Sequence, residues 1–128
     1  MAISKVERNQ RIDGILAGLV ALRGVVSAAI VDSDGFVTHI RRDFEVDTDA
    51  LGAAVQVLFA SASRAAQQVE QGETRLVLCE NKDGLMIFAP VAQAGFTLVV
   101  VADGAAMLGA LRFEIKGSVP ELSQLFGA

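Results

Sequence analysis

The stretch VVSAAIVDSDGFV (residues 25–37) decides how the chain folds, because it contains a strand, a turn and the start of a second strand. Residues 25–31 are small or β-branched, with Ser27 as the only polar one, which is typical of a central strand covered on both faces. A turn signal follows at residues 32–35, and residues 36–41 alternate and become polar toward their end. We therefore predict a β-hairpin whose second strand lies near a sheet edge.

Asp32 and Asp34 also follow an apolar run in a pattern that resembles the nucleophile loop of haloacid-dehalogenase-type phosphatases. In this remote alternative, Asp32 would accept a phosphoryl group. However, Phe36 stands where that family has Thr or Val, and its catalytic domain needs a parallel sheet rather than hairpins. A calcium loop is disfavoured because Arg41 would occupy the position of the closing glutamate. A turn, with Asp and Ser bonding local amides, accounts for all of residues 32–35.

The composition limits the classes of partner. At 128 residues the chain is expected to form one domain over residues 1–128. Its hydrophobic share of 52%, with 20% charged residues, exceeds what a solvated monomer usually needs, so we expect another chain to cover part of the apolar surface. A net charge of −4, without a Lys/Arg run or any Trp or Tyr, argues against nucleic acid or an anionic membrane as partner.

The residues that usually carry chemistry are isolated from one another. Cys79 is the only cysteine, so the chain has no internal disulfide or zinc-site pattern and fits a reducing cytoplasm. His39 is the only histidine. Because no Ser or Cys stands in a nucleophile motif that could use it as a base, we interpret His39 as a solvent-facing strand residue. Neither GxxxxGKS/T nor GxGxxG occurs. We expect no enzyme activity, cofactor or metal, and no targeting segment, because Glu7 and Asp13 interrupt the apolar N-terminal pattern.

Two helices are predicted around the hairpin. Ser4 and Glu7 form a capping-box pattern, in which the serine accepts from a backbone amide and the glutamate reaches back, and Gly24 ends the first helix. The second helix is predicted over residues 48–71, closed by Gly72. It has an apolar stripe and small residues on the opposite side. Both faces therefore need cover, and the small residues would let another helix approach closely.

Three further strands are predicted over residues 74–79, 85–89 and 96–102. The last is as continuously apolar as residues 25–31, so we expect these two strands to be neighbours at the sheet centre. The resulting strand order is second, first, fifth, fourth, third. Residues 74–79 are left at an edge of the sheet. Their side chains are too apolar to remain exposed to solvent, so we expect this edge to pair with a strand of another chain.

The C-terminal region is predicted to form two short helices. The first starts after residues 103–104 and ends at Gly117, and the second has Pro120 in its first turn and runs to Phe126. The element order α-β-β-α-β-β-β-α then describes an α+β domain, in which helices cover both faces of a five-stranded antiparallel sheet.

The whole pattern resembles the Roadblock family of dynein-light-chain-related modules, and within it the bacterial, stand-alone MglB-like branch. The resemblance covers nearly the full chain and is carried by the order of the segments ALRGV, VVSAAIVDSDGFV, TRLVLCE, FTLVVVAD and LGALRFEI. It implies a profilin/longin-like fold. The region from Gly117 to Pro120 departs from the longer final helix that the family leads us to expect.

The resemblance also implies a homodimer, in which the long second helices pack together and the third strands pair across a two-fold axis. Such a dimer would give the open edge strand a partner and would bury the second face of the long helix. The residues implied at the interface are Leu51, Ala54, Val55, Leu58, Ala62, Ala65, Thr74, Leu76, Val77, Leu78 and Cys79.

Members of the family serve as platforms for Ras-like small GTPases, as regulators that stimulate GTP hydrolysis, or as dynein-associated adaptors. The resemblance therefore implies a non-catalytic, homodimeric regulator or scaffold for a Ras-like GTPase, with a nucleotide-indifferent structural adaptor as the alternative. Arg41, Arg42 and Arg64 are candidates for contact with the partner.

Overall fold

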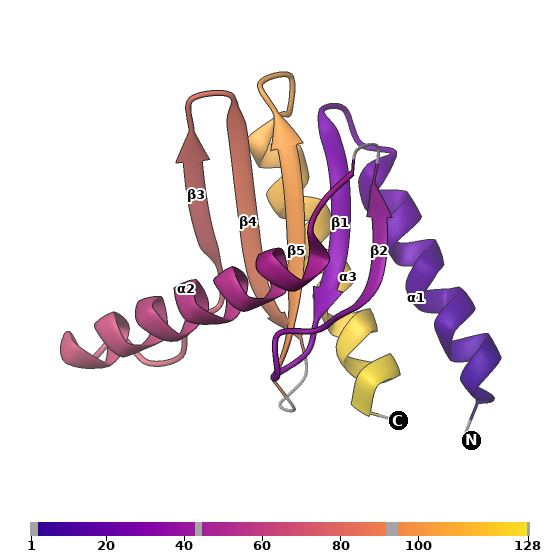
Figure 1. Cartoon of the computed structure of the whole chain (residues 1–128), viewed down its shortest axis with the longest axis horizontal. Helices are drawn as coiled ribbons and strands as arrows, with labels where there is room; N and C mark the ends of the chain where they lie inside the picture. The colour runs from indigo at the N-terminus through magenta and orange to yellow at the C-terminus, as the bar shows by residue number, and fades with distance from the viewer. Residues whose placement is uncertain (1–2, 43–44, 92–94, 128) are drawn as a thin grey trace.

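A five-stranded antiparallel sheet carries the fold in the computed structural model, which describes residues 3–42, 45–91 and 95–127 (Figure 1). The strands lie in the order β2-β1-β5-β4-β3, so the predicted fold class and strand order are confirmed. The elements in chain order are α1 (Lys5–Val20), β1 (Val25–Val31), β2 (Val37–Arg42), α2 (Thr48–Gln68), β3 (Val77–Asn81), β4 (Gly84–Val91), β5 (Phe96–Asp103) and α3 (Leu108–Gly127).

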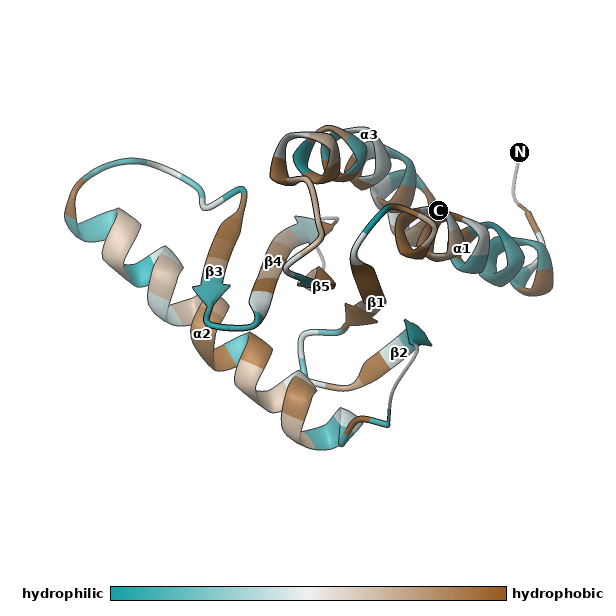
Figure 2. Ribbon diagram, turned by 90° about the horizontal axis from the view of Figure 1, so that it is seen from above, coloured by the Kyte–Doolittle hydropathy of each residue, from teal (hydrophilic) through white to brown (hydrophobic). Residues whose placement is uncertain are grey.

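Helices cover both faces of the sheet, with α1 and α3 on one side and α2 alone on the other (Figure 2). Successive β1 residues contribute to the two cores in turn, because side chains alternate along a strand. Ala28 and Ile30 pack with α1 and α3, whereas Ala29 and Val31 pack toward α2. Five of the seven residues of β1 are fully buried in succession, from Ser27 to Val31. The central strand predicted from the sequence is therefore confirmed.

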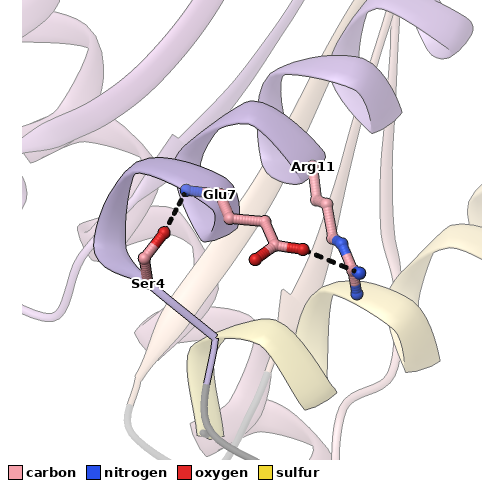
Figure 3. Close-up of polar contacts among 3 residues, drawn as sticks. All are labelled: Ser4, Glu7 and Arg11. Atoms are coloured by element: carbon pink, nitrogen blue, oxygen red, sulfur yellow. Dashed lines mark hydrogen bonds and ion pairs between the residues drawn. The ribbon is translucent and has the colours of Figure 1, made fainter.

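The start of α1 follows half of the predicted capping box. The Ser4 hydroxyl accepts a hydrogen bond from the backbone amide of Glu7 at 3.0 Å (Figure 3). The Glu7 carboxylate points along the helix to Arg11, at 3.2 Å, instead of back to the cap. The glutamate half of the prediction is wrong, because an oppositely charged side chain one turn ahead competes for the carboxylate.

The hairpin tip holds α2 in place through a close approach of two glycines. Gly35 lies in the β1–β2 turn with φ at +86°, and a side chain at Gly52 of α2 would overlap its carbonyl oxygen. The Gln56 side-chain amide also donates to the carbonyl oxygen of Asp32 in the same turn. The turn therefore fixes where α2 crosses the sheet, and only glycine at position 52 permits this distance.

The helix α2 ends earlier than predicted, at Gln68 instead of residue 71. The amide of Gln71 donates to the carbonyl of Ala66 at 3.0 Å, and the amide of Glu70 donates to that of Gln67 at 3.2 Å. This pair of bonds forms a Schellman motif, in which the left-handed residue is usually glycine. Here Glu70 adopts it, with φ at +57°, so the predicted Gly72 is not the residue that ends the helix.

The edge strand β3 is displaced along the chain from its predicted position at residues 74–79. It spans Val77–Asn81, so Thr74 and Leu76 lie in the connection from α2 instead of in the strand. The physical reason is the two-residue turn at Lys82 and Asp83. It pairs Asn81 with Gly84, and the ladder with β4 therefore begins at the turn itself.

The C-terminal region forms one continuous helix, α3, so the predicted break between Gly117 and Pro120 is wrong. Leu122 and Leu125 are buried on the same face as Leu111 and Ile115. Burying two leucines contributes about 3–6 kcal/mol. This outweighs the roughly 3 kcal/mol cost of an interior proline. Pro120 itself lies on the exposed side of the helix, where water can satisfy the freed carbonyl.

His39 is half-buried beneath α1, so its prediction as a solvent-facing residue is wrong. Its Nε2 lies 3.2 Å from the Asn9 side-chain oxygen, and its ring meets that of Phe126 edge-on at 5.9 Å. Burial lowers the pKa of His39; the Asp13 carboxylate opposes this shift and the Arg8 guanidinium reinforces it. The sequence did not reveal this packing, because the contacts come from the distant helices α1 and α3.

Replacement of Glu70 by glycine is expected to stabilise the domain by up to about 1 kcal/mol, because glycine adopts a positive φ without steric cost. Chemical denaturation of Glu70→Gly and of the parent protein measures the difference. Glu73→Gly, in the same connection, is the control. An unchanged or lower midpoint for Glu70→Gly would contradict the assigned strain.

His39 is expected to make stability depend on pH. Its pKa is lowered in the folded state, so the unfolded chain takes up the proton more readily. The contribution of neutral His39 is therefore complete above its ordinary pKa of about 6.5 and is lost as the pH falls through the lowered folded value. Urea midpoints between pH 7.5 and 5 should fall more steeply for the parent than for His39→Gln. Parallel curves would show that His39 does not carry this dependence.

Candidate interaction surface

No other element of the described residues packs on the outward face of α2. At 1.5 Å per residue its 21 residues extend about 31 Å, whereas five strands spaced about 4.8 Å apart span about 19 Å. The C-terminal end of α2 accordingly passes beyond β3 (Figure 1). Over residues 50–61 its exposed residues are small or aliphatic, and they include Val57 and Leu58, at 67% and 37% exposure. Arg64, Gln67 and Gln68 add exposed polar side chains toward the end of the helix. Ala54 and Ala65 are also exposed, so a second helix could approach this face closely.

The edge strand β3 is open along one side. It pairs with β4 on its other side, and Asn81 and Gly84 flank the two-residue turn as a hydrogen-bonded pair. Alternate pairs are hydrogen-bonded in an antiparallel ladder, so Cys79 and Val77 also bond to β4. The backbone groups of Leu78 and Glu80 therefore point to the open edge. Leu78 is 38% exposed and is a large apolar side chain at an unprotected edge.

We call the exposed face of α2, together with the open edge of β3, the α2–β3 surface. Ala54, Leu58 and Ala65 are exposed on the α2 part of this surface, and Ala62 is half-buried. The Leu78 side chain, which pairs in register with Ile87, points to the opposite face of the sheet from α2, so only its backbone belongs to the open edge.

The remaining predicted interface residues are used within the chain. Val55 is buried and Leu51 packs beside it against the sheet, so neither side chain is free for a partner. Val77 and Cys79 are half-buried on the same side, beneath α2. Leu76 packs on the opposite core. Thr74 precedes the strand and is half-buried.

Two residues that position this surface were missed from the sequence. Phe59 packs on the α2 core one turn after Val55, and Gly52 makes the close contact with the hairpin tip. The spacing of Phe59 from Val55 was a usable signal, because residues four apart share a helix face. A glycine inside a helix was the corresponding signal for a close backbone approach.

The three arginines proposed for partner contact do not form one cluster. Arg41 and Arg42 end the edge strand β2, whereas Arg64 lies in the C-terminal part of α2. All three are exposed, and none forms an ion pair with another part of the chain that the structure describes.

The Asp32 carboxylate stabilises the hairpin turn. One carboxylate oxygen of Asp32 accepts from the amides of Asp34 and Phe36, each at 2.9 Å, and Gly35 takes the positive φ. The turn prediction is confirmed. The strands on either side are antiparallel, so the parallel sheet on which the phosphatase alternative depended is not present.

Within residues 3–42, 45–91 and 95–127, no group of three or more His, Cys, Asp or Glu side chains could hold a metal ion. None of the helices in this part of the chain is both long and apolar enough to cross a membrane.

Solved structures share the fold at low sequence identity. The Roadblock/LC7 domain from Streptomyces avermitilis is 22% identical with a TM-score of 0.82, covering 91% of this chain and 98% of that one. MglB of Myxococcus xanthus is 20% identical with a TM-score of 0.86, covering 99% and 95%. Profilin II of Acanthamoeba castellanii is 22% identical with a TM-score of 0.60, covering 90% and 95%. These likenesses confirm the profilin-like fold.

Sequence comparison decides the family. A search of curated proteins gave no significant match. The family model described as the Roadblock/LC7 domain, however, matches residues 11–102, which include α2 and every strand up to the end of β5 apart from its last residue. The chain therefore belongs to the Roadblock/LC7 domain family.

Proposed function

We propose that this protein is a homodimeric, non-catalytic regulator or scaffold that binds a Ras-like small GTPase in the cytoplasm. The observation that carries the proposal is the α2–β3 surface, which combines an exposed apolar helix face with an open strand edge. Membership of the Roadblock/LC7 family and the structural likeness to MglB of Myxococcus xanthus support it.

The dimer follows from the self-complementarity of this surface. Two β3 edges related by a two-fold axis can pair as antiparallel strands, which joins two five-stranded sheets into one. The end of α2 that passes beyond β3 would then lie over the partner's sheet (Figure 1). Its small residues and Leu58 would pack against the partner's α2. Such an arrangement closes the open edge of β3.

The GTPase would bind residues that stay exposed after the dimer forms. A protein without nucleotide-binding loops can still regulate a GTPase by holding its switch segments in one arrangement, which leaves the hydrolysis chemistry in the partner. Arg41, Arg42 and Arg64 are exposed cations that could pair with acidic groups of the GTPase. Because Arg41 and Arg42 lie on β2 and Arg64 on α2, we expect them to contact different parts of the partner.

Proline at position 78 is expected to weaken the dimer. The Leu78 amide points to the open edge, so Leu78→Pro removes one cross-dimer hydrogen bond per subunit without breaking the ladder with β4. Two bonds at about 1 kcal/mol each correspond to a dissociation constant about 30-fold higher. Sedimentation equilibrium measures this change.

Leu78→Ala, which keeps the backbone amide, is the matched control for the edge. It shortens the side chain but should retain most of the dimer. Circular dichroism confirms that both variants fold. A Leu78→Pro protein that dimerises as tightly as Leu78→Ala would exclude β3 pairing.

Binding to a GTPase is expected to depend on the bound nucleotide. Purified small GTPases encoded near this gene, loaded with GDP or a non-hydrolysable GTP analogue, are tested by biolayer interferometry. At least about a tenfold difference in dissociation constant between the two states is expected, equivalent to about 1.4 kcal/mol of coupling. Equal affinity would favour the nucleotide-indifferent adaptor. No binding to any of them would contradict the GTPase proposal.

A further inference from the structure

A groove runs between α1 and α3, on the face of the sheet opposite α2. One hollow of about 530 Å³ lies between Gly14 of α1 and Gln124 of α3. A second, of about 310 Å³, lies between Gly18 and Glu114. The two hollows share Ile15 and Glu121 in their linings, so they form one continuous depression, which we call the α1–α3 groove.

The floor of the α1–α3 groove is apolar, and several helix positions beside it are glycines, which have no side chain. Leu19 and Leu125 are buried beneath it, and Ile15 is half-buried. The walls contain Gly14, Gly18 and Gly117, which are all within helices.

These glycines are not required by packing within the chain. A Cβ atom added at any of the three would have no neighbour within 4 Å. An interior helical glycine costs about 1 kcal/mol relative to alanine. Their effect is to leave open space between α1 and α3, wide enough for side chains of another segment to reach the apolar floor.

The charged residues that line the groove indicate which charge its ligand would have. Glu114 and Glu121 line it, are exposed and form no ion pair within the described residues. Arg11, also in the lining, is already paired with Glu7 at 3.2 Å. The groove therefore presents two uncompensated carboxylates beside an apolar floor. This excludes acidic peptides, nucleic acid and anionic lipid headgroups, and favours a cationic, partly apolar ligand.

The spacing of the carboxylates indicates the form of that ligand. Glu114 and Glu121 are seven residues apart, about 10.5 Å along one side of α3. Lys or Arg residues seven apart on another helix have the same separation, and the apolar residues between them face the same side. A helix lying between two antiparallel helices is a common mode of recognition.

We propose that the α1–α3 groove binds a basic amphipathic helix of a partner protein. Apolar residues of that helix contact Ile15 and fill the space that Gly14, Gly18 and Gly117 leave open, and its Lys or Arg side chains pair with Glu114 and Glu121. The groove lies on the opposite sheet face from α2, so its occupation is independent of the α2–β3 surface and of the proposed GTPase (Figure 2).

Two synthetic helical peptides test the proposal on the full chain. Both have the same leucine face; one has lysines and the other glutamates at flanking positions seven residues apart. In fluorescence anisotropy, the lysine peptide is expected to bind at least about tenfold more tightly, and more weakly as salt rises. Equal binding of both peptides, or binding of neither, overturns the proposal.

Substitutions then locate the binding site. Glu114→Lys with Glu121→Lys should lower the affinity for the lysine peptide about tenfold or more. Glu73→Lys with Asp83→Lys makes the same change of net charge away from the groove and should leave the affinity unchanged.

Gly18→Leu adds a side chain whose Cβ has no neighbour within 4 Å, so it should occupy the groove and abolish binding, and circular dichroism checks that the variant folds. Binding by Gly18→Leu at the parent affinity would place the peptide elsewhere. Equal losses in the two charge-reversal variants would show only a general charge effect, and would likewise overturn the assignment.

Discussion

The fold depends on the pairing of two apolar strands, β1 and β5, at the centre of the sheet. Both are buried on both faces, so helices must cover the sheet on each side. On one side α1 and α3 share this task, and on the other α2 does it alone. A single helix can cover only a strip about 10 Å wide, so side chains beyond that strip and at the sheet edge remain accessible. The unequal cover of the two faces is thus the origin of the α2–β3 surface.

The position of α2 is set at its N-terminal half, where it meets the hairpin tip. The contact between Gly35 and Gly52 and the bond from Gln56 to the turn fix the crossing point. Because the helix is longer than the sheet is wide, a crossing point near β1 and β2 makes its other end pass beyond β3. The aspartates of the turn therefore act on function indirectly, by shaping the loop that holds the helix.

The sequence predicted the sheet well because its strands differ sharply in pattern. The continuous apolar runs of β1 and β5 identified the centre, and the strand order that followed left β3 at an edge. Errors arose where local signals opposed long-range packing. Gly117 and Pro120 resemble a helix end, yet burial of Leu122 and Leu125 keeps α3 continuous. Leu51 and Val55 could not be separated from Leu58 by pattern alone, because helix phase relative to the sheet is a tertiary property.

Part of the apolar excess of the composition lies on the exposed face of α2. Val57 and Leu58 are exposed there, where a second copy would bury them. The other face differs in character, because the α1–α3 groove sets carboxylates beside an apolar floor. A homodimer needs self-complementarity, which apolar contacts and strand edges supply, whereas two like-charged grooves repel each other. The charge of the α1–α3 groove therefore makes it unsuited to self-association and leaves it free for a partner of opposite charge.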